Sequence, residues 1–183
     1  MSKIFKIVKD SNPSLREKSV NLDLPLDKEI EDLGFEMLEY LKLSQDEEFL
    51  KKHPEVRSGV GLAAPQIGKN IKLIAVYFFD GKKDIELVLV NPKIIAESAQ
   101  KCYLSSGEGC LSVAKEHQGY IYRNYRIKVK AYNLLTKKEE VIEARGYLSV
   151  VLQHEIDHLS GILFYDRINN FEPFKVLSGA IEL

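Results

Sequence analysis

Two of the four histidines in this 183-residue sequence stand four positions apart, in His154-Glu155-Ile156-Asp157-His158. Residues at that spacing lie on one face of an α-helix, so both imidazoles can reach a single metal ion. Glu155 points to the same region and can accept a proton from water at that ion. We therefore predict a catalytic metal site here, with a pair of polar surface histidines as the simpler alternative.

A catalytic metal site needs a third protein ligand and a position open to water. In the metzincin extension of the histidine pattern the third ligand would fall on Phe164, which cannot bind a metal. The downstream carboxylates Glu172 and Glu182 stand beside a proline and near the end of the chain, where they are poor candidates. Cys110, in Gly107-Glu108-Gly109-Cys110-Leu111-Ser112, is the better one, because one cysteine and two histidines form a known catalytic set.

Two other functions could use the same helix. A zincin-type metallopeptidase that cleaves peptide bonds shares the two histidines but lacks its downstream third ligand. A structural zinc site is closed by four protein ligands, and the spare candidates Cys102, His53 and His117 do not have finger-like spacing. We interpret Cys102 as a small buried hydrophobe. With only two cysteines, both thiols are expected to be free.

Helical periodicity marks two segments. Between Gly146 and Gly161 apolar residues recur at helical spacing around the histidines, and Ser160-Gly161 provides a stop signal. From Pro25 to Leu43 a similar pattern predicts an amphipathic helix with Pro25 near its first turn. Gln45 to Ser58 is polar and predicts a surface loop or a helical extension. Gly59 to Gly68 predicts an irregular loop.

Strands are predicted for the middle of the chain. The apolar runs Lys72 to Phe79 and Asp84 to Asn91 flank Asp80-Gly81, a hairpin signal. Further strands are expected at 93–103, 120–132 and 139–144. Within 120–132, apolar residues alternate with lysines, as in a half-buried antiparallel strand. Helices packed on an antiparallel sheet make this an α+β fold, and no linker or repeat divides residues 1–183 into more than one domain.

Composition narrows the class of protein. The chain has 26 basic and 27 acidic residues, a net charge of −1, and 45% hydrophobic residues, which are values of an ordinary globular domain. Nothing predicts a nucleic-acid footprint, since the densest basic run, 123–130, alternates like a strand. No apolar run has the ~20 residues of a membrane helix, and the first ten residues lack the core of a signal peptide. We therefore expect a cytoplasmic protein.

Three segments together resemble the peptide deformylases, which remove the formyl group from the initiator methionine of nascent bacterial proteins. The motifs G-x-G-x-A-A-x-Q, E-G-C-x-S and Q-H-E-x-D-H appear complete and in order as Gly59 to Gln66, Glu108 to Ser112 and Gln153 to His158. The insertion at 45–58 and the Gly119-Tyr120 region are similar to the longer class common in Gram-positive bacteria. The resemblance implies antiparallel sheets packed around a central metal-binding helix, with an N-terminal amphipathic helix.

The resemblance also implies a role for each residue of the site. Residues implied as metal ligands are Cys110, His154 and His158, with Glu155 as general acid and base. The side chain of Gln66 and the backbone N–H of Leu111 would stabilise the oxyanion. Val60 would line the methionine pocket, the backbone of Gly61 would hold the substrate chain, and Glu108 and Gln153 would support the site from behind.

The implied cofactor is one divalent metal ion per chain, with Fe²⁺ as the native ion and Zn²⁺, Ni²⁺ or Co²⁺ as other occupants, because this ligand set suits all four. The implied partners are N-formylmethionyl nascent peptides, with transient ribosome contact and neither direct nucleic-acid binding nor a membrane. The expected activity is hydrolysis of a linear amide with release of formate, an N-terminal processing step of protein biosynthesis.

Overall fold

The computed structural model describes residues 3–183, so Met1 and Ser2, part of the segment inspected for a signal peptide, lie outside it. The helices and strands follow one another along the chain in this order: η1 Pro13–Arg16, α1 Lys28–Leu43, α2 Glu47–Lys52, β1 Gly61–Ala63, η2 Ala64–Ile67, β2 Leu73–Phe79, β3 Asp84–Glu97, β4 Lys101–Tyr103, β5 Arg123–Asn124, β6 Arg126–Asn133, β7 Lys138–Arg145, α3 Tyr147–His158, η3 Phe164–Arg167 and β8 Ile181–Glu182. Among these residues no helix is long and apolar enough to cross a membrane.

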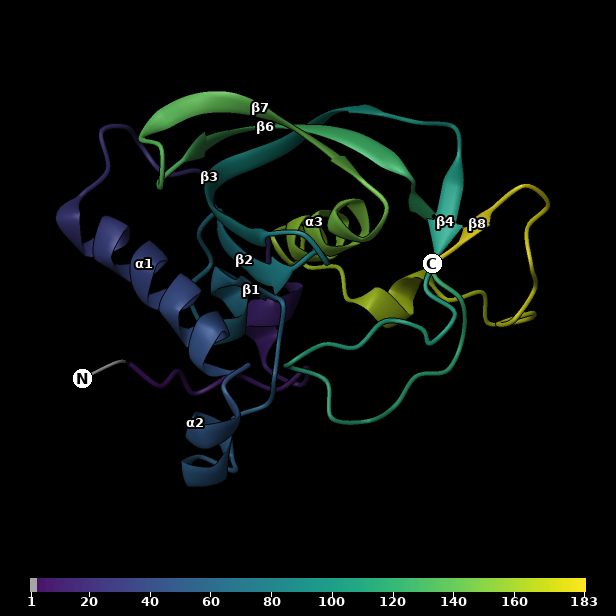
Figure 1. Ribbon diagram of the computed structural model, residues 1–183, viewed down its shortest axis with the longest axis horizontal. Helices are drawn as coiled ribbons and strands as arrows, with labels where there is room; N and C mark the ends of the chain where they lie inside the picture. Colours follow the sequence, from purple (N-terminus) through teal and green to yellow (C-terminus); the bar gives the residue numbers. More distant parts are fainter. Residues whose placement is uncertain (1–2) are drawn as a thin grey trace.

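A five-stranded antiparallel sheet in the order β1-β2-β3-β6-β7 separates the two long helices. Successive side chains of a strand point to opposite faces, and in β2 Leu73 packs in the core under α1 while Ile74 packs in the core that contains α3. Figure 1 shows α3 enclosed by the curved β6–β7 hairpin and by β1 and β2, with α1 outside the sheet. The α+β class and the central position of α3 are therefore confirmed.

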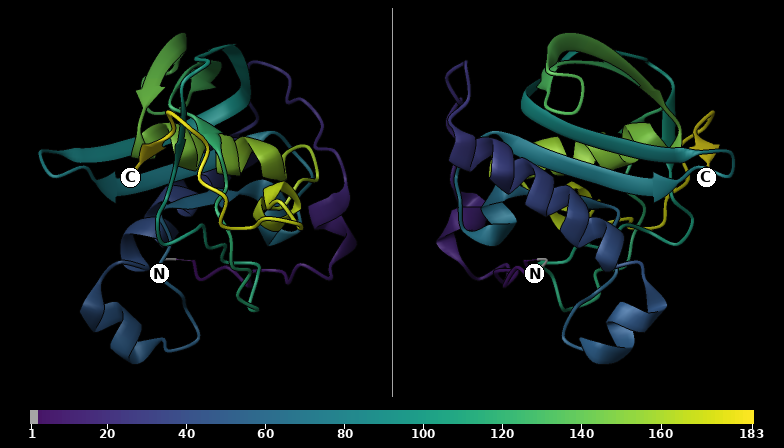
Figure 2. Two further views of the ribbon diagram at one scale, coloured as in Figure 1. Left: turned by 90° about the vertical axis from the view of Figure 1, so that its right-hand side faces the viewer. Right: turned by 60° about the vertical axis from the view of Figure 1, so that its left-hand side comes forward.

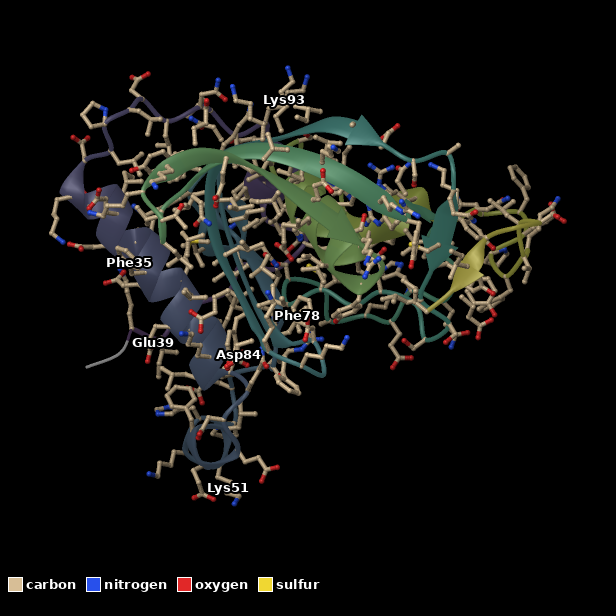
Figure 3. The ribbon with its side chains drawn as sticks, turned by 45° about the horizontal axis from the view of Figure 1, so that its top comes forward. Phe35, Glu39, Lys51, Phe78, Asp84 and Lys93 are labelled. Atoms are coloured by element: carbon tan, nitrogen blue, oxygen red, sulfur yellow. The ribbon has the colours of Figure 1, made fainter. Side chains whose placement is uncertain are left out.

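Helix α1 begins three residues later than its sequence pattern predicts. Pro25 lies before the helix, and Asp27, in extended conformation, is the N-cap. The backbone carbonyl of Asp27 accepts the first helical bonds from Ile30 and Glu31, while its side chain makes no capping bond. The buried face includes Leu33, Met37 and Leu41, whereas Phe35 and Glu39 lie on the outer side of the helix (Figure 3). Buried and exposed residues thus lie on different sides of α1.

The predicted hairpin at Asp80-Gly81 joins β2 to β3, but the division of the next segment into two strands at residue 92 is wrong. Strand β3 continues to Glu97 through a register shift between Val90 and Lys93. Asn91 has a φ of 52° there, and its side chain bonds the backbone of Leu22. Asparagine tolerates this conformation and Pro92 sits at the irregularity, so the strand bulges without ending.

The last part of the predicted strand 93–103 belongs to a different sheet. Strand β4 pairs with β5 and, in parallel, with β8 near the end of the chain. The predicted strand 120–132 is likewise divided into β5 and β6. In β6 the expected alternation is confirmed, because Ile127, Val129 and Ala131 are buried while the lysines between them are exposed.

Residues 45–58 are predicted as a surface loop or a helical extension, and residues 59–68 as an irregular loop. The polar excursion 45–58 contains the short helix α2, which projects from the body of the molecule (Figure 2) and carries Lys51 at its outer end (Figure 3). The irregular loop predicted for 59–68 is wrong in part, since it holds strand β1 and the 3₁₀ helix η2. Three residues are too few for an alternating pattern, so periodicity could not reveal this strand.

Candidate active site

Helix α3 carries His154, His158 and the glutamate between them, Glu155, into the interior. It begins after Gly146, whose φ of 57° favours glycine. His154, Glu155 and His158 are 9%, 4% and 1% exposed. His154 and His158, four positions apart, lie on one face of the helix, and Glu155, three positions before His158, lies next to that face. A pair of ordinary surface histidines is thereby excluded.

Cys110 comes to these histidines from an irregular loop between β4 and β5. One ligand atom from each of Cys110, His154 and His158 can be chosen so that all lie within 4.8 Å of one another. The Sγ of Cys110 is 3.4 Å from Nε2 of His158. Within residues 3–183 this trio is the only cluster with metal-ligand geometry, which leaves the four-ligand structural zinc site without support.

The donor set fits a divalent transition metal. A thiolate and two imidazoles suit such ions, and three protein ligands leave a position for water or substrate. The Oε2 atom of Glu155 is buried without a hydrogen-bond partner in the described part of the chain, which leaves a carboxylate oxygen available beside the ligands.

The ligand positions of a zincin peptidase are not realised here. Phe164 stacks on the ring of His154, with ring centroids 6.1 Å apart, and so closes that side of the imidazole. Glu182 accepts a hydrogen bond from Tyr103 in the small sheet, and Glu172 pairs with Lys175 on the surface. Neither glutamate belongs to the metal-ligand cluster.

A buried ion network fixes the orientation of His154. Its Nδ1 lies 2.8 Å from Oε2 of Glu108, and Arg123 bonds that same carboxylate through Nε and Nη2. Arg123 also donates to Asp157 of α3, which in turn binds Arg167. The carboxylate directs the other imidazole nitrogen toward the cluster, as carboxylate partners of metal-bound histidines do.

The family resemblance implies Glu108 as a support of the site, but it does not point to Arg123. The arginine has a side chain only 2% exposed, although it begins a run that reads as a half-exposed strand. Two carboxylates face it from the β4–β5 loop and from α3, and only this pairing makes burial of the guanidinium tolerable. The signal that could have found it is the match of one arginine to two buried acids, which requires three-dimensional neighbours.

Charge within the site follows from burial and from these partners. Burial would raise the pKa of Glu108, but hydrogen bonds from Arg123 and His154 lower it to about 2. Burial would lower the pKa of His154, but its contacts with Cys110 and Glu108 raise it to about 10. Glu108 and Cys110 thus surround the imidazole of His154 with electron-rich groups, and such groups also attract a metal cation.

The other two α3 residues have pKa values displaced mainly by burial. Burial, together with the positive charges of His154 and Arg123, holds the pKa of His158 well below its ordinary value. Burial raises the pKa of Glu155 to about 7, against the opposing effect of His154. A carboxyl group with a pKa near neutrality can both accept and return a proton.

Gln66 is 1% exposed and has a defined amide orientation. Its Oε1 accepts a hydrogen bond of 2.8 Å from the backbone N–H of Ala63. Its Nε2 is therefore turned toward Cys110 Sγ and Ser112 Oγ, 3.4 Å from each. The amide group donates into the site from the wall opposite α3.

Glycines allow strand β1 and the Cys110 loop to approach closely. A Cβ on Gly61 would overlap the carboxylate of Glu155, and one on Gly59 would lie 2.8 Å from Cδ1 of Leu111. These two contacts explain why the first motif needs glycine at both positions. They also bring the backbone of Gly61 against the predicted proton carrier.

A cavity with a volume of about 270 Å³ lies between α3 on one side and β1 with the loop around Cys110 on the other. It is lined by most of the predicted site residues together with apolar side chains of α3, namely Val60, Gly61, Gln66, Cys110, Leu111, His154, Glu155, Tyr147, Val150 and Val151. His158 completes the ligand cluster from behind. Gln153 instead ties α3 to β5 through Asn124, so it supports the helix and makes no hydrogen bond to a ligand within residues 3–183. Both cysteines are free, and Cys102 is buried in β4 as expected.

The chain is similar to known proteins over nearly its whole length. The family model for polypeptide deformylase matches residues 4–174. A peptide deformylase of Macrococcus caseolyticus is 46% identical over 178 residues, which are 96% of this chain and 95% of that protein. A peptide deformylase of Oceanobacillus iheyensis is 45% identical over 172 residues, covering 93% of this chain and 92% of that protein.

Solved structures have the same fold. A probable peptide deformylase from Synechococcus phage S-SSM7 aligns with a TM-score of 0.73 and 35% identity, covering 90% of this chain and 100% of that one. A plant peptide deformylase aligns with a TM-score of 0.74 and 30% identity, covering 93% of this chain and 84% of that one.

Proposed function

Since this chain belongs to the polypeptide deformylase family, we propose a role for each residue of its cavity. The protein is a metal-dependent hydrolase that removes the N-formyl group from the N-terminal formylmethionine of newly synthesised proteins. The observation that carries the residue roles is the convergence of Cys110, His154 and His158 beside the buried carboxylate of Glu155.

We propose that Cys110, His154 and His158 hold one divalent ion, and that Fe²⁺ is its native identity. The thiolate and imidazole donors also accept Zn²⁺, Ni²⁺ or Co²⁺, while similarity to the family favours iron. Such an ion would lower the pKa of a water molecule in the site, so that this water can attack an amide at neutral pH. Metal analysis of protein purified without oxygen, from cells grown without added metal, tests the identity directly.

Glu155 is proposed to carry the proton of the reaction. Its carboxylate accepts a proton as water adds to the formyl carbon, and then returns that proton to the amide nitrogen as the carbon–nitrogen bond breaks. The products are formate and a free N-terminal amine. The close approach of Gly61 and the surrounding apolar side chains keep bulk water away from this carboxyl group.

Negative charge develops on the formyl oxygen during the addition, and two donors are proposed to stabilise it. The first is Nε2 of Gln66, whose direction is set by the bond between Oε1 and Ala63. The second is the backbone N–H of Leu111, which lines the same cavity. Fixed donors of this kind lower the barrier because they need no reorganisation as the charge appears.

Substrate is proposed to bind as an additional strand along β1. The carbonyl of Val60 accepts from Tyr77 in β2, whereas Ala63 N–H turns away from β2 to Gln66. Backbone groups alternate in direction along a strand, so N–H and C=O of Gly61 also face away from β2, on the free edge of the sheet. An extended peptide can pair there, with its methionine side chain beside Val60 and the apolar residues of α3.

The wider context is likewise proposed. Residues 1–183 act as a single catalytic domain in the cytoplasm, on N-formylmethionyl nascent peptides that the enzyme meets through transient contact with the ribosome. We propose that this cavity of about 270 Å³ admits a formyl group and excludes internal peptide bonds.

The experiment that tests the function measures formate release from a formyl-Met peptide by the metal-loaded protein. We expect formate and an intact deformylated peptide, with no cleavage of the unformylated control. Cleavage of internal peptide bonds, or no formate at any metal loading, would contradict the function.

A further inference from the structure

Arg57 makes an unusual set of contacts at the edge of the cavity. Its Nη1 lies 3.3 Å from the carbonyl oxygen of Cys110, 3.4 Å from that of Leu111 and 3.0 Å from that of Val113. One end of a single guanidinium group thus donates to three carbonyls of the same turn. The contact joins two segments that are more than fifty residues apart in the sequence and that both line one cavity.

The carbonyl of Cys110, to which Arg57 donates, and the N–H of Leu111 belong to the same peptide group. A peptide group is planar, and this one is trans, since the only cis bond in residues 3–183 precedes Pro25. Its C=O and N–H therefore point in opposite directions. A guanidinium bound to the Cys110 oxygen holds that end of the plane and directs the Leu111 N–H away from Arg57.

The N–H of Leu111 is available for a substrate. Within the described chain it donates no hydrogen bond, although the neighbouring Val113 N–H bonds the carbonyl of Cys110 at 3.1 Å. Leu111 itself is 8% exposed and lines the cavity beside Cys110 and Glu155. A donor that is shielded from bulk water and yet lacks an internal partner is what a group awaiting an oxyanion requires.

The charge of Arg57 has no counter-ion among residues 3–183: no carboxylate lies within 4 Å of it. The guanidinium therefore acts on the carbonyls without being neutralised by a nearby acid. A positive charge at the oxygen end of a peptide group increases the polarity of the N–H at the other end. The donor toward the cavity becomes both better directed and stronger.

We infer that Arg57 is a positioning residue for deformylation, which orients and polarises the Cys110–Leu111 peptide group so that its N–H stabilises the oxyanion. This role rests on the proposed function of Leu111. The motif residues do not include Arg57, and its effect reaches the reacting atoms only through the backbone.

The test compares Arg57→Met and Arg57→Lys with Arg126→Met as a matched control. Arg126 is also exposed, but it lies on β6 at a distant cavity and has no part in the site. We expect Arg57→Met to lower kcat by about tenfold to a hundredfold, less than the 10²–10³ lost when an oxyanion donor is removed outright. KM should stay within about twofold, because the contact matters in the transition state. Arg57→Lys should recover part of kcat, and Arg126→Met should match the wild type.

All rates are expressed per metal-loaded molecule, so that loss of ion or of folded protein does not count as an effect on the transition state. The second readout is the amide ¹⁵N resonance of Leu111 in the zinc form, which should move in Arg57→Met and stay in place in Arg126→Met. Wild-type kcat per loaded molecule in Arg57→Met would overturn the inference. So would a raised KM at unchanged kcat, which would make Arg57 a substrate-binding residue. Absence of formate release by the wild type would instead refute the proposed function itself.

Discussion

On the α3 wall of the cavity, side chains are held by other side chains: Glu108, which reaches α3 from the β4–β5 loop, orients His154, and Arg123 joins Glu108 to Asp157. On the opposite wall, formed by β1 and the loop around Cys110, side chains hold the backbone. Gln66 bonds the N–H of Ala63, and Arg57 bonds three carbonyls.

The difference follows from what each wall contributes. Ligation and proton transfer need particular side chains, so the α3 wall requires defined residue types at helical spacing. Oxyanion stabilisation and strand-like pairing use N–H and C=O groups, which almost every residue has. The second wall therefore depends on the path of its backbone, and Arg57, which holds part of this path, lies outside the reaction.

The largest expected effect comes from removing Cys110, the one proposed metal ligand on the wall formed by β1 and the loop around Cys110. Cys110→Ala should lose both metal and activity, because a charged donor and a coordination bond disappear together. The loss should exceed the roughly 10–100-fold of a missing supporting residue. Cys102→Ala is the matched control and should keep both. Metal content and formate release of the two variants decide, and equal values would remove Cys110 from the ligand set.

A change at Glu155 should separate chemistry from metal binding on the α3 wall. Glu155→Gln keeps the size of the side chain but cannot accept and return a proton, so kcat should fall by roughly 10²–10⁴. Metal content and thermal stability should remain close to wild type. Single-turnover formate release on the loaded variant measures the effect. Near-normal turnover would show that another group carries the proton.

The ion network behind His154 should affect metal affinity more than chemistry. Glu108→Gln removes the charge that orients the imidazole, and metal affinity should fall by roughly 10–100-fold. Competition with a chelator measures this, with Glu182→Gln as control, because Glu182 bonds only Tyr103 in the small sheet. Unchanged affinity in Glu108→Gln would mean that the helix alone orients the ligand.

Both walls contribute to the methionine pocket, through Val60 and through Val150 and Val151 of α3. Formyl-Met peptides should therefore exceed formyl-Ala peptides in kcat/KM by more than about tenfold, since each buried methylene contributes ~0.8 kcal/mol. The comparison uses peptides identical after the first residue. Comparable efficiencies would rule this pocket out.

The smallest effect on catalysis is expected from Gln45, which holds the start of β1 but does not line the cavity. Gln45 donates hydrogen bonds of 2.9 Å to the carbonyls of Gly59 and Tyr77, at the start of β1. Gln45→Ala should destabilise the fold by about 1–3 kcal/mol and raise KM less than about tenfold, with kcat nearly unchanged. Gln100→Ala, which also removes bonds to backbone carbonyls but on the surface, is the control. A fall in kcat at constant KM would place Gln45 closer to the chemistry.

Much of the fold can be predicted from local patterns. The apolar spacing around His154, the alternation of Ile127 and Val129 with lysines, and the Asp80-Gly81 turn each indicate an element that the structure contains. The predictions are wrong where a strand is very short or where its pattern is interrupted. β1 is too short for periodicity, and β3 passes through Asn91 and Pro92 without ending.

The sequence alone determined the chemistry of the α3 wall, because a helix places residues four apart on one face whatever surrounds it. It also predicted Cys110 as the third donor by residue type. Only the tertiary structure decided that Cys110 meets His158, that Arg123 is buried between two acids, and that Gly61 touches Glu155. These contacts join segments that are distant in the sequence, and they depend on how sheet and helix pack rather than on any local preference of the chain.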